Sequence, residues 1–240
     1  MISDNIKSVR QRIARCCEKI GRRPEDVELV CVTKEAASDE IETVLALGVK
    51  VLGENKVQDL VSKYNIIGKR VLWHLIGHLQ TNKVKDAVAI VSLIHSVDSI
   101  HLAKEIDRRA HRINKIQDIL IQVNVSGEKS KFGIRLEDVF GVISQIVSYS
   151  NISIRGLMTI APEAPDPEAA RPYFRALREL RDRISLENGI ASGRILGPRN
   201  DIDRYPVLSM GMSNDFETAI EEGSNMVRIG RAIFGDGITA

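Results

Sequence analysis

Apolar residues along this chain follow two alternating patterns. Short runs rich in Val, Ile and Leu are typical of buried parallel strands, and the stretches between them repeat their apolar residues at helical spacing. The runs predict eight strands, at Val27–Thr33, Val49–Gly53, Arg70–Ile76, Ile90–Val97, Ile116–Val125, Ile152–Thr159, Pro206–Gly211 and Asn225–Ile229. The stretches predict helices between them, at Asp39–Leu47, Val57–Tyr64, Thr81–Val88, Ile100–Asn114, Leu136–Tyr149, Glu168–Asn188 and Ser213–Glu222.

This alternation predicts the α/β class and a single (β/α)8 TIM-type barrel with an additional N-terminal helix. An open doubly wound sheet is the alternative, but the Gly-rich dinucleotide turn is missing after the first strand. Residues 1–22 form the extra helix, since Ile2, Ile6, Val9 and Ile13 recur at helical spacing. We expect one domain over 1–240, with the barrel at 27–235.

Charge and cysteine content narrow the class of protein. The 34 Lys and Arg residues nearly balance the 32 Asp and Glu residues, so nothing marks the chain as a nucleic-acid or membrane binder. The N-terminal stretch lacks the apolar core of a signal peptide, and no run is long enough to span a bilayer, which predicts a cytoplasmic protein. Its three cysteines, Cys16, Cys17 and Cys31, form neither a disulfide framework nor a spaced zinc site.

The stretch Val27 to Lys34 carries the first candidate group. In a barrel the carboxyl ends of the strands gather on the face where chemistry resides, and Lys34 ends the first strand. Side chains alternate along a strand, so Lys34 shares a face with Val30 and Val32. If that face points inward, desolvation lowers the pKa of the lysine and leaves an amine able to form a Schiff base. The alternative is a strand-end lysine that reaches solvent.

The last two strand ends resemble a phosphate cradle. The sequence GMSND predicts Ser213 as the N-cap of a helix, and Gly230 lets an anion approach the backbone at the next strand end. Glycine and serine are also ordinary residues at such turns. Arg228 lies on the same face as Gly230, and an arginine pointing into the barrel needs a structural carboxylate or an acceptor on a ligand.

Seven ordered blocks of sequence carry a resemblance to a known family. They are TK, GEN, WHLIGHLQTNK, IHSVDS, VNVSGEKSKFGI, GLMTI and LSMGMSNDFETAIEEGSNMVRIGRAIFG, which together extend from about Val27 to Gly235. With these blocks the chain resembles the pyridoxal-phosphate homeostasis protein family, whose members are similar to the barrel domain of alanine racemase. The resemblance implies a protein that binds pyridoxal 5′-phosphate (PLP) and acts in intracellular vitamin B6 cofactor homeostasis.

The resemblance also implies roles for individual residues. Lys34 would hold PLP as an internal aldimine, and Ser213 with the backbone at Gly230 and Arg231 would hold the phosphate. Arg228 would face the pyridine nitrogen and Asn55 would lie beside the pyridine ring. Further candidates near the site are Lys63, His78, Lys131, Met158 and Met212.

Three features depart from the family pattern. Glu35 to Ser38 follow Lys34, where many members have a basic residue and a proline, and Arg231 replaces a commonly smaller residue. The segment Gly197 to Asn200 lies outside the shared motifs and has no assigned role.

A carrier and an amino-acid racemase are the two functions to be separated. Racemisation needs proton donors on both faces of the cofactor. Alanine racemases use a tyrosine supported by a second, β-rich domain, and the chain ends after the eighth strand. Tyr64, Tyr149 and Tyr173 fall in predicted helices, and Tyr205 precedes a strand. We therefore expect a carrier without robust catalytic activity, monomeric, whose partners include apo-forms of PLP enzymes.

Other polar groups have ordinary explanations. His74 and His78 have the separation of a helical metal pair, but they lie at a strand end, so we expect no metal site. Glu54, Asp98 and Asp215 are candidate acid–base groups and are equally helix-start carboxylates.

Overall fold

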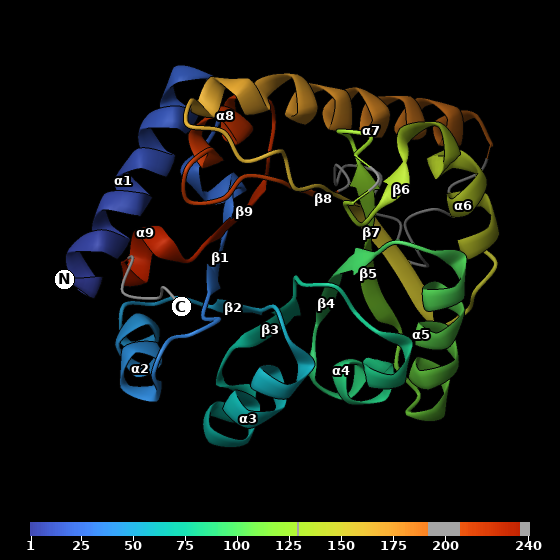
Figure 1. Ribbon diagram of the computed structural model, residues 1–240, viewed down its shortest axis with the longest axis horizontal. Helices are drawn as coiled ribbons and strands as arrows, with labels where there is room; N and C mark the ends of the chain where they lie inside the picture. The colour runs from blue at the N-terminus through green and yellow to red at the C-terminus, as the bar shows by residue number, and fades with distance from the viewer. Residues whose placement is uncertain (129, 192–206, 236–240) are drawn as a thin grey trace.

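Eight parallel strands close into a barrel in the computed structural model, which describes residues 1–128, 130–191 and 207–235 (Figure 1). In hydrogen-bonded order they are β1 (Glu28–Val32), β2 (Val51–Glu54), β3 (Leu72–Leu75), β4 (Leu93–Val97), β5 (Gln117–Asn124), β7 (Ile152–Met158), β8 (Val207–Ser209) and β9 (Met226–Ile229). Pairing of β9 with β1 and of β4 with β5 closes the barrel. The predicted barrel is confirmed.

Helices surround this barrel (Figure 1). They are α1 (Ile2–Lys19), α2 (Ser38–Ala46), α3 (Val57–Ile67), α4 (Val84–Ile90), α5 (Ile100–Arg112), α6 (Val139–Ile146), α7 (Arg171–Ala191), α8 (Phe216–Glu221) and α9 (Arg231–Phe234). Short 3₁₀ turns cover Pro24–Asp26, Gly68–Arg70, Thr81–Lys83, Leu136–Asp138 and Pro167–Ala170. The predicted N-terminal helix is present as α1, which packs against α2, α8 and α9.

Two short elements were not predicted, and one helix start was wrong. The two-residue strand β6 (Ile134–Arg135), which pairs with β5, and the four-residue helix α9 are too short to show a period in the sequence. The helix predicted to begin at Ser213 begins at Phe216, with Asp215 as its N-cap. Asp215 Oδ1 accepts a hydrogen bond from the Met212 N–H, 2.6 Å away, so residues 213–215 form a turn instead.

The strands separate two apolar regions. One region fills the barrel interior and consists of Val30, Val51, Ile76, Leu93, Leu120, Met158 and Met226, with Val32 and Val207 packed against it. The larger region lies outside the barrel and includes Cys31 and Leu52, which alternate with the inward residues. The inward orientation expected for Val30 and Val32 is therefore confirmed.

The three cysteines are free, buried thiols. Burial raises the pKa of each, that of Cys31 to about 12. Within the described ranges, no group of three His, Cys, Asp or Glu side chains is arranged to hold a metal ion. Nor do these ranges contain a helix with the length and apolar character needed to cross a membrane.

Candidate functional site

Lys34 lies two residues beyond the end of β1, at the carboxyl end of the barrel. Its side chain is 49% exposed, and its Nζ atom lies 3.1 Å from Glu35 Oε1. The apolar, desolvated environment that the sequence suggested is absent, because Lys34 and Glu35 form an exposed turn after the inward-facing Val32. The amine is accessible to a ligand that approaches from solvent.

A buried polar cluster lies behind Lys34, on the outer side of the barrel wall. Glu54 at the end of β2 is fully buried, and its Oε1 atom accepts hydrogen bonds from Thr33 Oγ1 at 2.5 Å and Lys63 Nζ at 2.7 Å. Lys63, on α3, also donates to the Thr33 carbonyl. Lys63 therefore connects the ends of β1 and β2 on the outer side of the barrel wall. Glu54 is bound as a buried structural carboxylate, and its Oε2 atom has no hydrogen-bond partner among the described residues.

Asn55 follows Glu54 at the mouth of the barrel and is half-buried. The backbone of Gly77, in the loop after β3, packs directly against it, since a Cβ atom at Gly77 would lie 2.2 Å from the Asn55 carbonyl oxygen. Only glycine fits that approach. The two loops therefore hold each other, and they fix Asn55 close to the strand ends.

The ends of β8 and β9 meet as the cradle hypothesis requires. Ser213 Oγ accepts a hydrogen bond from the backbone N–H of Ala232 at 3.2 Å, which joins the turn after β8 to the start of α9. Gly230 is the N-cap of α9, and a Cβ atom there would lie 3.1 Å from the Val32 carbonyl oxygen of β1. The cradle thus contacts the strand that carries Lys34. Ser213 contributes through this junction and not as the helix N-cap.

Arg231 lies on the outer rim of this cradle. Its side chain is 55% exposed, and Nη2 lies 3.3 Å from Glu163 Oε1 in the loop after β7. The extra charge noted in the sequence therefore has a partner at the surface, while the Arg231 backbone remains part of the turn next to Gly230.

Arg228 points into the barrel from β9 and is 3% exposed. Its Nη1 donates to Ser209 Oγ at 2.6 Å and its Nη2 to the Thr159 carbonyl oxygen at 2.9 Å. Among the described residues no carboxylate lies within ion-pair distance of Arg228, and both hydrogen-bond acceptors are neutral, although the Asp215 charge in the turn after β8 also favours the cation. Burial lowers the pKa of Arg228 to about 10, which leaves the guanidinium charged at neutral pH.

Two histidines extend this polar contact across the barrel interior. His95 Nδ1 lies 2.9 Å from Ser209 Oγ, and His95 Nε2 lies 3.1 Å from His74 Nδ1. Both imidazoles are buried, and burial lowers the pKa of His74 to about 3 and that of His95 well below its ordinary value. They are therefore neutral hydrogen-bonding groups. His74 and His78 do not converge, because His78 binds Asp98 instead.

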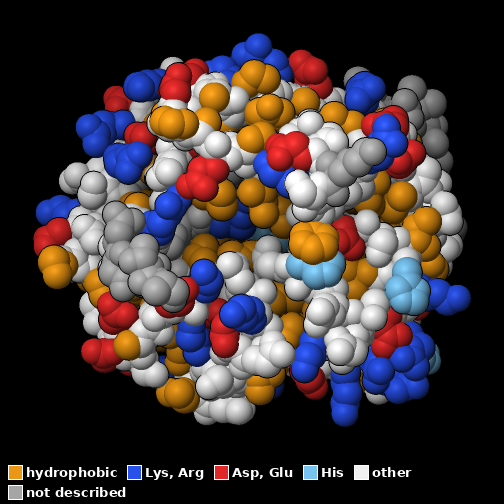
Figure 2. Space-filling model, viewed as in Figure 1, with side chains coloured by type: hydrophobic (Ala, Val, Ile, Leu, Met, Phe, Trp, Pro, Cys, Tyr) orange, Lys and Arg blue, Asp and Glu red, His pale blue; other side chains and the backbone are white. Residues whose placement is uncertain are grey.

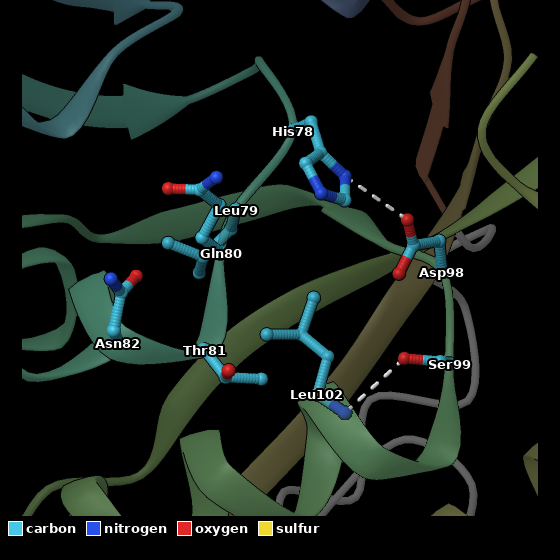
Figure 3. Close-up of a pocket in the computed structure, with 8 residues that line it drawn as sticks. All are labelled: His78, Leu79, Gln80, Thr81, Asn82, Asp98, Ser99 and Leu102. Atoms are coloured by element: carbon cyan, nitrogen blue, oxygen red, sulfur yellow. Dashed lines mark hydrogen bonds and ion pairs between the residues drawn. The ribbon is translucent and has the colours of Figure 1, made fainter.

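His78 and Lys131 lie on the opposite side of the mouth from the cradle strands. His78 Nδ1 lies 3.2 Å from Asp98 Oδ2, and its imidazole stacks on the exposed Phe132 ring at 3.9 Å between centroids. Lys131 Nζ lies 3.0 Å from Glu128 Oε1 in the loop between β5 and β6. Next to them a cavity of about 530 Å³ opens between the loops after β3 and β4, with His78, Gln80, Asp98 and Ser99 on its walls (Figure 3).

The remaining candidates differ in access. Met158 is fully buried in the barrel interior, whereas Met212 is partly exposed in the turn after β8. The face of the molecule seen along the barrel is hollowed near its centre, with hydrophobic and basic side chains around the hollow (Figure 2). The segment Gly197 to Asn200 and Tyr205 lie outside the described residues.

Sequence reasoning missed His95 and Ser209. It searched predicted strand ends, whereas His95 lies in the middle of β4 and Ser209 ends β8, two residues before the strand end predicted at Gly211. The sequence did contain a signal for His95. His95 lies two residues from Leu93 and so on the same inward face, which places a polar side chain on a face that is otherwise apolar.

Comparison with known proteins places this geometry in a family. Residues 5–237 match the family described as the N-terminal domain of alanine racemase. The pyridoxal phosphate homeostasis protein of Aquifex aeolicus is 43% identical over 234 residues, which cover 97% of this chain and 97% of that protein.

Solved structures agree. The structure of PipY from Synechococcus elongatus with PLP bound has a TM-score of 0.82 and 29% sequence identity, and the match covers 98% of this chain and 100% of that one. An alanine racemase of Clostridium difficile shares the fold, with a TM-score of 0.70 at 16% identity, and the match covers 98% of this chain and 58% of the racemase. The 43% identity to the Aquifex aeolicus protein covers nearly the full length of both chains. Together with the matched barrel, this similarity shows that the chain belongs to the pyridoxal phosphate homeostasis protein family.

Proposed function

We propose that this chain binds PLP as a Schiff base on Lys34 and acts in intracellular vitamin B6 cofactor homeostasis. One observation carries the proposal: the cradle at Ser213 and Gly230 packs against Val32, two residues before Lys34. An amine and an anion-binding turn thus lie on adjacent strands, as an aldehyde with a phosphate tail requires. The PipY structure with PLP bound supports PLP as the ligand.

The residues present fit the cofactor. The accessible Lys34 amine would condense with the PLP aldehyde, forming a C=N bond and releasing water. Ser213 and the backbone of Gly230 and Arg231 would hold the phosphate, and half-buried Asn55 would lie beside the pyridine ring. Arg228 would face the pyridine nitrogen, where a cation disfavours protonation and so weakens PLP as an electron sink.

The more peripheral candidates have different roles in this proposal. Lys63 acts from behind the barrel wall by fixing the ends of β1 and β2. Met158 packs inside the barrel beneath the site, and Met212, His78 and Lys131 border its mouth.

A carrier fits these groups better than a racemase. Among the described residues, Tyr64 lies in α3, Tyr173 in α7 and Tyr149 in the turn after α6, so none lies at a strand end where it could exchange a proton with the cofactor. A cationic Arg228 opposes carbanion chemistry as well. We further propose that the protein is a monomer within the cell and passes PLP to apo-forms of PLP enzymes.

Absorbance spectroscopy of the purified chain mixed with PLP tests the proposal. A Schiff-base band should form, and borohydride should convert it to a secondary amine that peptide mass spectrometry locates at Lys34. The Lys34→Ala variant should lack the band, whereas Lys85→Ala, which removes an exposed lysine on α4, should retain it. A full band in Lys34→Ala would remove the site assignment. Turnover of an amino acid at about one per second or faster would overturn the carrier role.

A further inference from the structure

A hydrogen-bonded chain of four side chains crosses the barrel interior. It runs from Arg228 on β9 to Ser209 on β8, then to His95 on β4 and His74 on β3, with heavy-atom distances of 2.6, 2.9 and 3.1 Å. All four side chains are buried, at 4% exposure or less. Strands β8 and β4 are not neighbours in the barrel, so the bond from Ser209 to His95 spans its interior.

The donor and acceptor capacities of these groups fix one direction for the chain. Arg228 can only donate, so Ser209 Oγ accepts from it. Among the described residues, the other partner of the Ser209 hydroxyl is His95 Nδ1, so the hydroxyl proton is donated there. His95 then carries its proton on Nε2 and donates to His74 Nδ1. Ser209, His95 and His74 thereby each turn a lone pair toward the preceding group, in the direction of Arg228.

This arrangement explains how a charged guanidinium is held inside the barrel with no carboxylate at hydrogen-bonding distance among the described residues. An ion pair would compensate the charge of Arg228, whereas a line of oriented neutral dipoles stabilises the cation and leaves its net charge in place. The second contact, from Nη2 to the Thr159 carbonyl at 2.9 Å, fixes the orientation of the guanidinium plane.

We propose that Ser209, His95 and His74 are positioning residues, which hold the Arg228 cation in one orientation toward the pyridine nitrogen of bound PLP. This inference rests on the proposed function. It gives a role to His74 and His95, which lie in the third and fourth sequence blocks and are buried in the barrel interior.

The Ser209→Ala variant tests the chain at its central link, and Ser224→Ala is the matched control. Ser224 is equally buried, and its hydroxyl bonds only to backbone carbonyls at Leu208, Met210 and Met226. Loss of a hydrogen bond to a charged group should weaken PLP binding about tenfold or more in Ser209→Ala and shift the absorbance maximum of the bound cofactor. Ser224→Ala should leave both unchanged. A Ser209→Thr variant, which restores the hydroxyl, should recover binding.

The outcomes separate this inference from the proposed function. If the wild-type chain takes up no PLP, both fail. If it binds PLP but Ser209→Ala and Ser224→Ala behave alike, only the positioning role is overturned. Nitrogen-15 NMR of the histidines can be measured on the wild-type protein, so it does not depend on whether a variant folds. We expect the Nε2–H tautomer on both His95 and His74. An Nδ1–H tautomer on His95 would contradict the direction of the hydrogen bonds.

Discussion

Two cations lie near the mouth of this barrel, and they are held in different ways. Lys63, a partly exposed side chain on the outer side of the wall, lies 2.7 Å from the fully buried Glu54 carboxylate and also donates to the Thr33 carbonyl. Arg228, buried inside the barrel, donates to the neutral oxygens of Ser209 and Thr159. The first cation is paired directly with a carboxylate, whereas the second hydrogen-bonds to neutral groups and feels the Asp215 charge only from beyond ion-pair distance.

The difference separates a structural charge from a ligand-directed one. In a buried ion pair the two charges largely cancel, so the pair attracts a ligand only weakly. Removal of one partner leaves the other charge unpaired and destabilises the protein. A buried guanidinium held by dipoles costs more to desolvate in the free protein, and it can recover that cost when a ligand acceptor approaches. The comparison therefore predicts that the two sites respond oppositely to substitution.

The largest expected effect is that of Glu54→Ala. This substitution leaves the Lys63 ammonium and the Thr33 hydroxyl without their shared acceptor, and it should lower the free energy of unfolding by about 3–5 kcal/mol in urea titrations. The double variant Glu54→Ala/Lys63→Met should recover part of the loss. As a control, Glu42→Ala removes an exposed carboxylate bound to Arg70 and should cost less than about 1 kcal/mol. Equal losses in the two single variants would refute the distinction.

Acid should destabilise the folded protein through its buried histidines, at a pH where most carboxylates are still charged. Burial lowers the pKa of His74 to about 3 in the folded state, from the 6.5 of an unburied histidine. Below pH 6.5 the unfolded chain therefore binds more protons than the folded one, and stability falls as pH falls from 6.5 toward 3. We expect His74 to contribute a loss of about 2 kcal/mol between pH 7 and pH 5.

Denaturant titrations at the two pH values measure this loss. The His74→Asn variant should show a smaller difference between pH 7 and pH 5 than the wild type does. A difference of the same size in both would mean that His74 does not remain neutral in the folded protein.

Replacing the Arg228 cation should affect binding more than folding. Arg228→Gln loses hydrogen bonds to Ser209 and Thr159 but also removes a buried charge, so the free energy of unfolding should change by only about 1 kcal/mol. PLP binding, followed by absorbance titration, should weaken by about tenfold or more. A loss of stability as large as that in Glu54→Ala would show that Arg228 is structural.

The smallest effect is expected at the exposed cation of the rim. Glu163→Gln removes the partner of Arg231, and because both side chains are more than half exposed, stability should change by less than about 0.5 kcal/mol. The freed charge should tighten PLP binding by about twofold at low salt, and added salt should abolish the gain. Tighter binding that persists at high salt would indicate a direct contact instead of a screened field.

The barrel was predictable because it depends on short-range patterns. The inward parity of Val30 and Val32 and the alternation of strands with helices follow from spacing along the chain. The cradle was predictable in place but not in detail, since the Ser213 hydroxyl bonds to Ala232, 19 residues away, and does not cap its own helix.

The sequence by itself determined the order of strands and helices, the face that Arg228 shares with Gly230, and the set of motifs shared with the family. Only the tertiary structure decided the partners of the charged groups: Lys63 with Glu54 behind the wall, and Arg228 with Ser209, His95 and His74 across the interior. The physical reason is that periodicity acts between neighbours in the chain. Compensation of a buried charge, in contrast, depends on which strands face each other when the barrel closes.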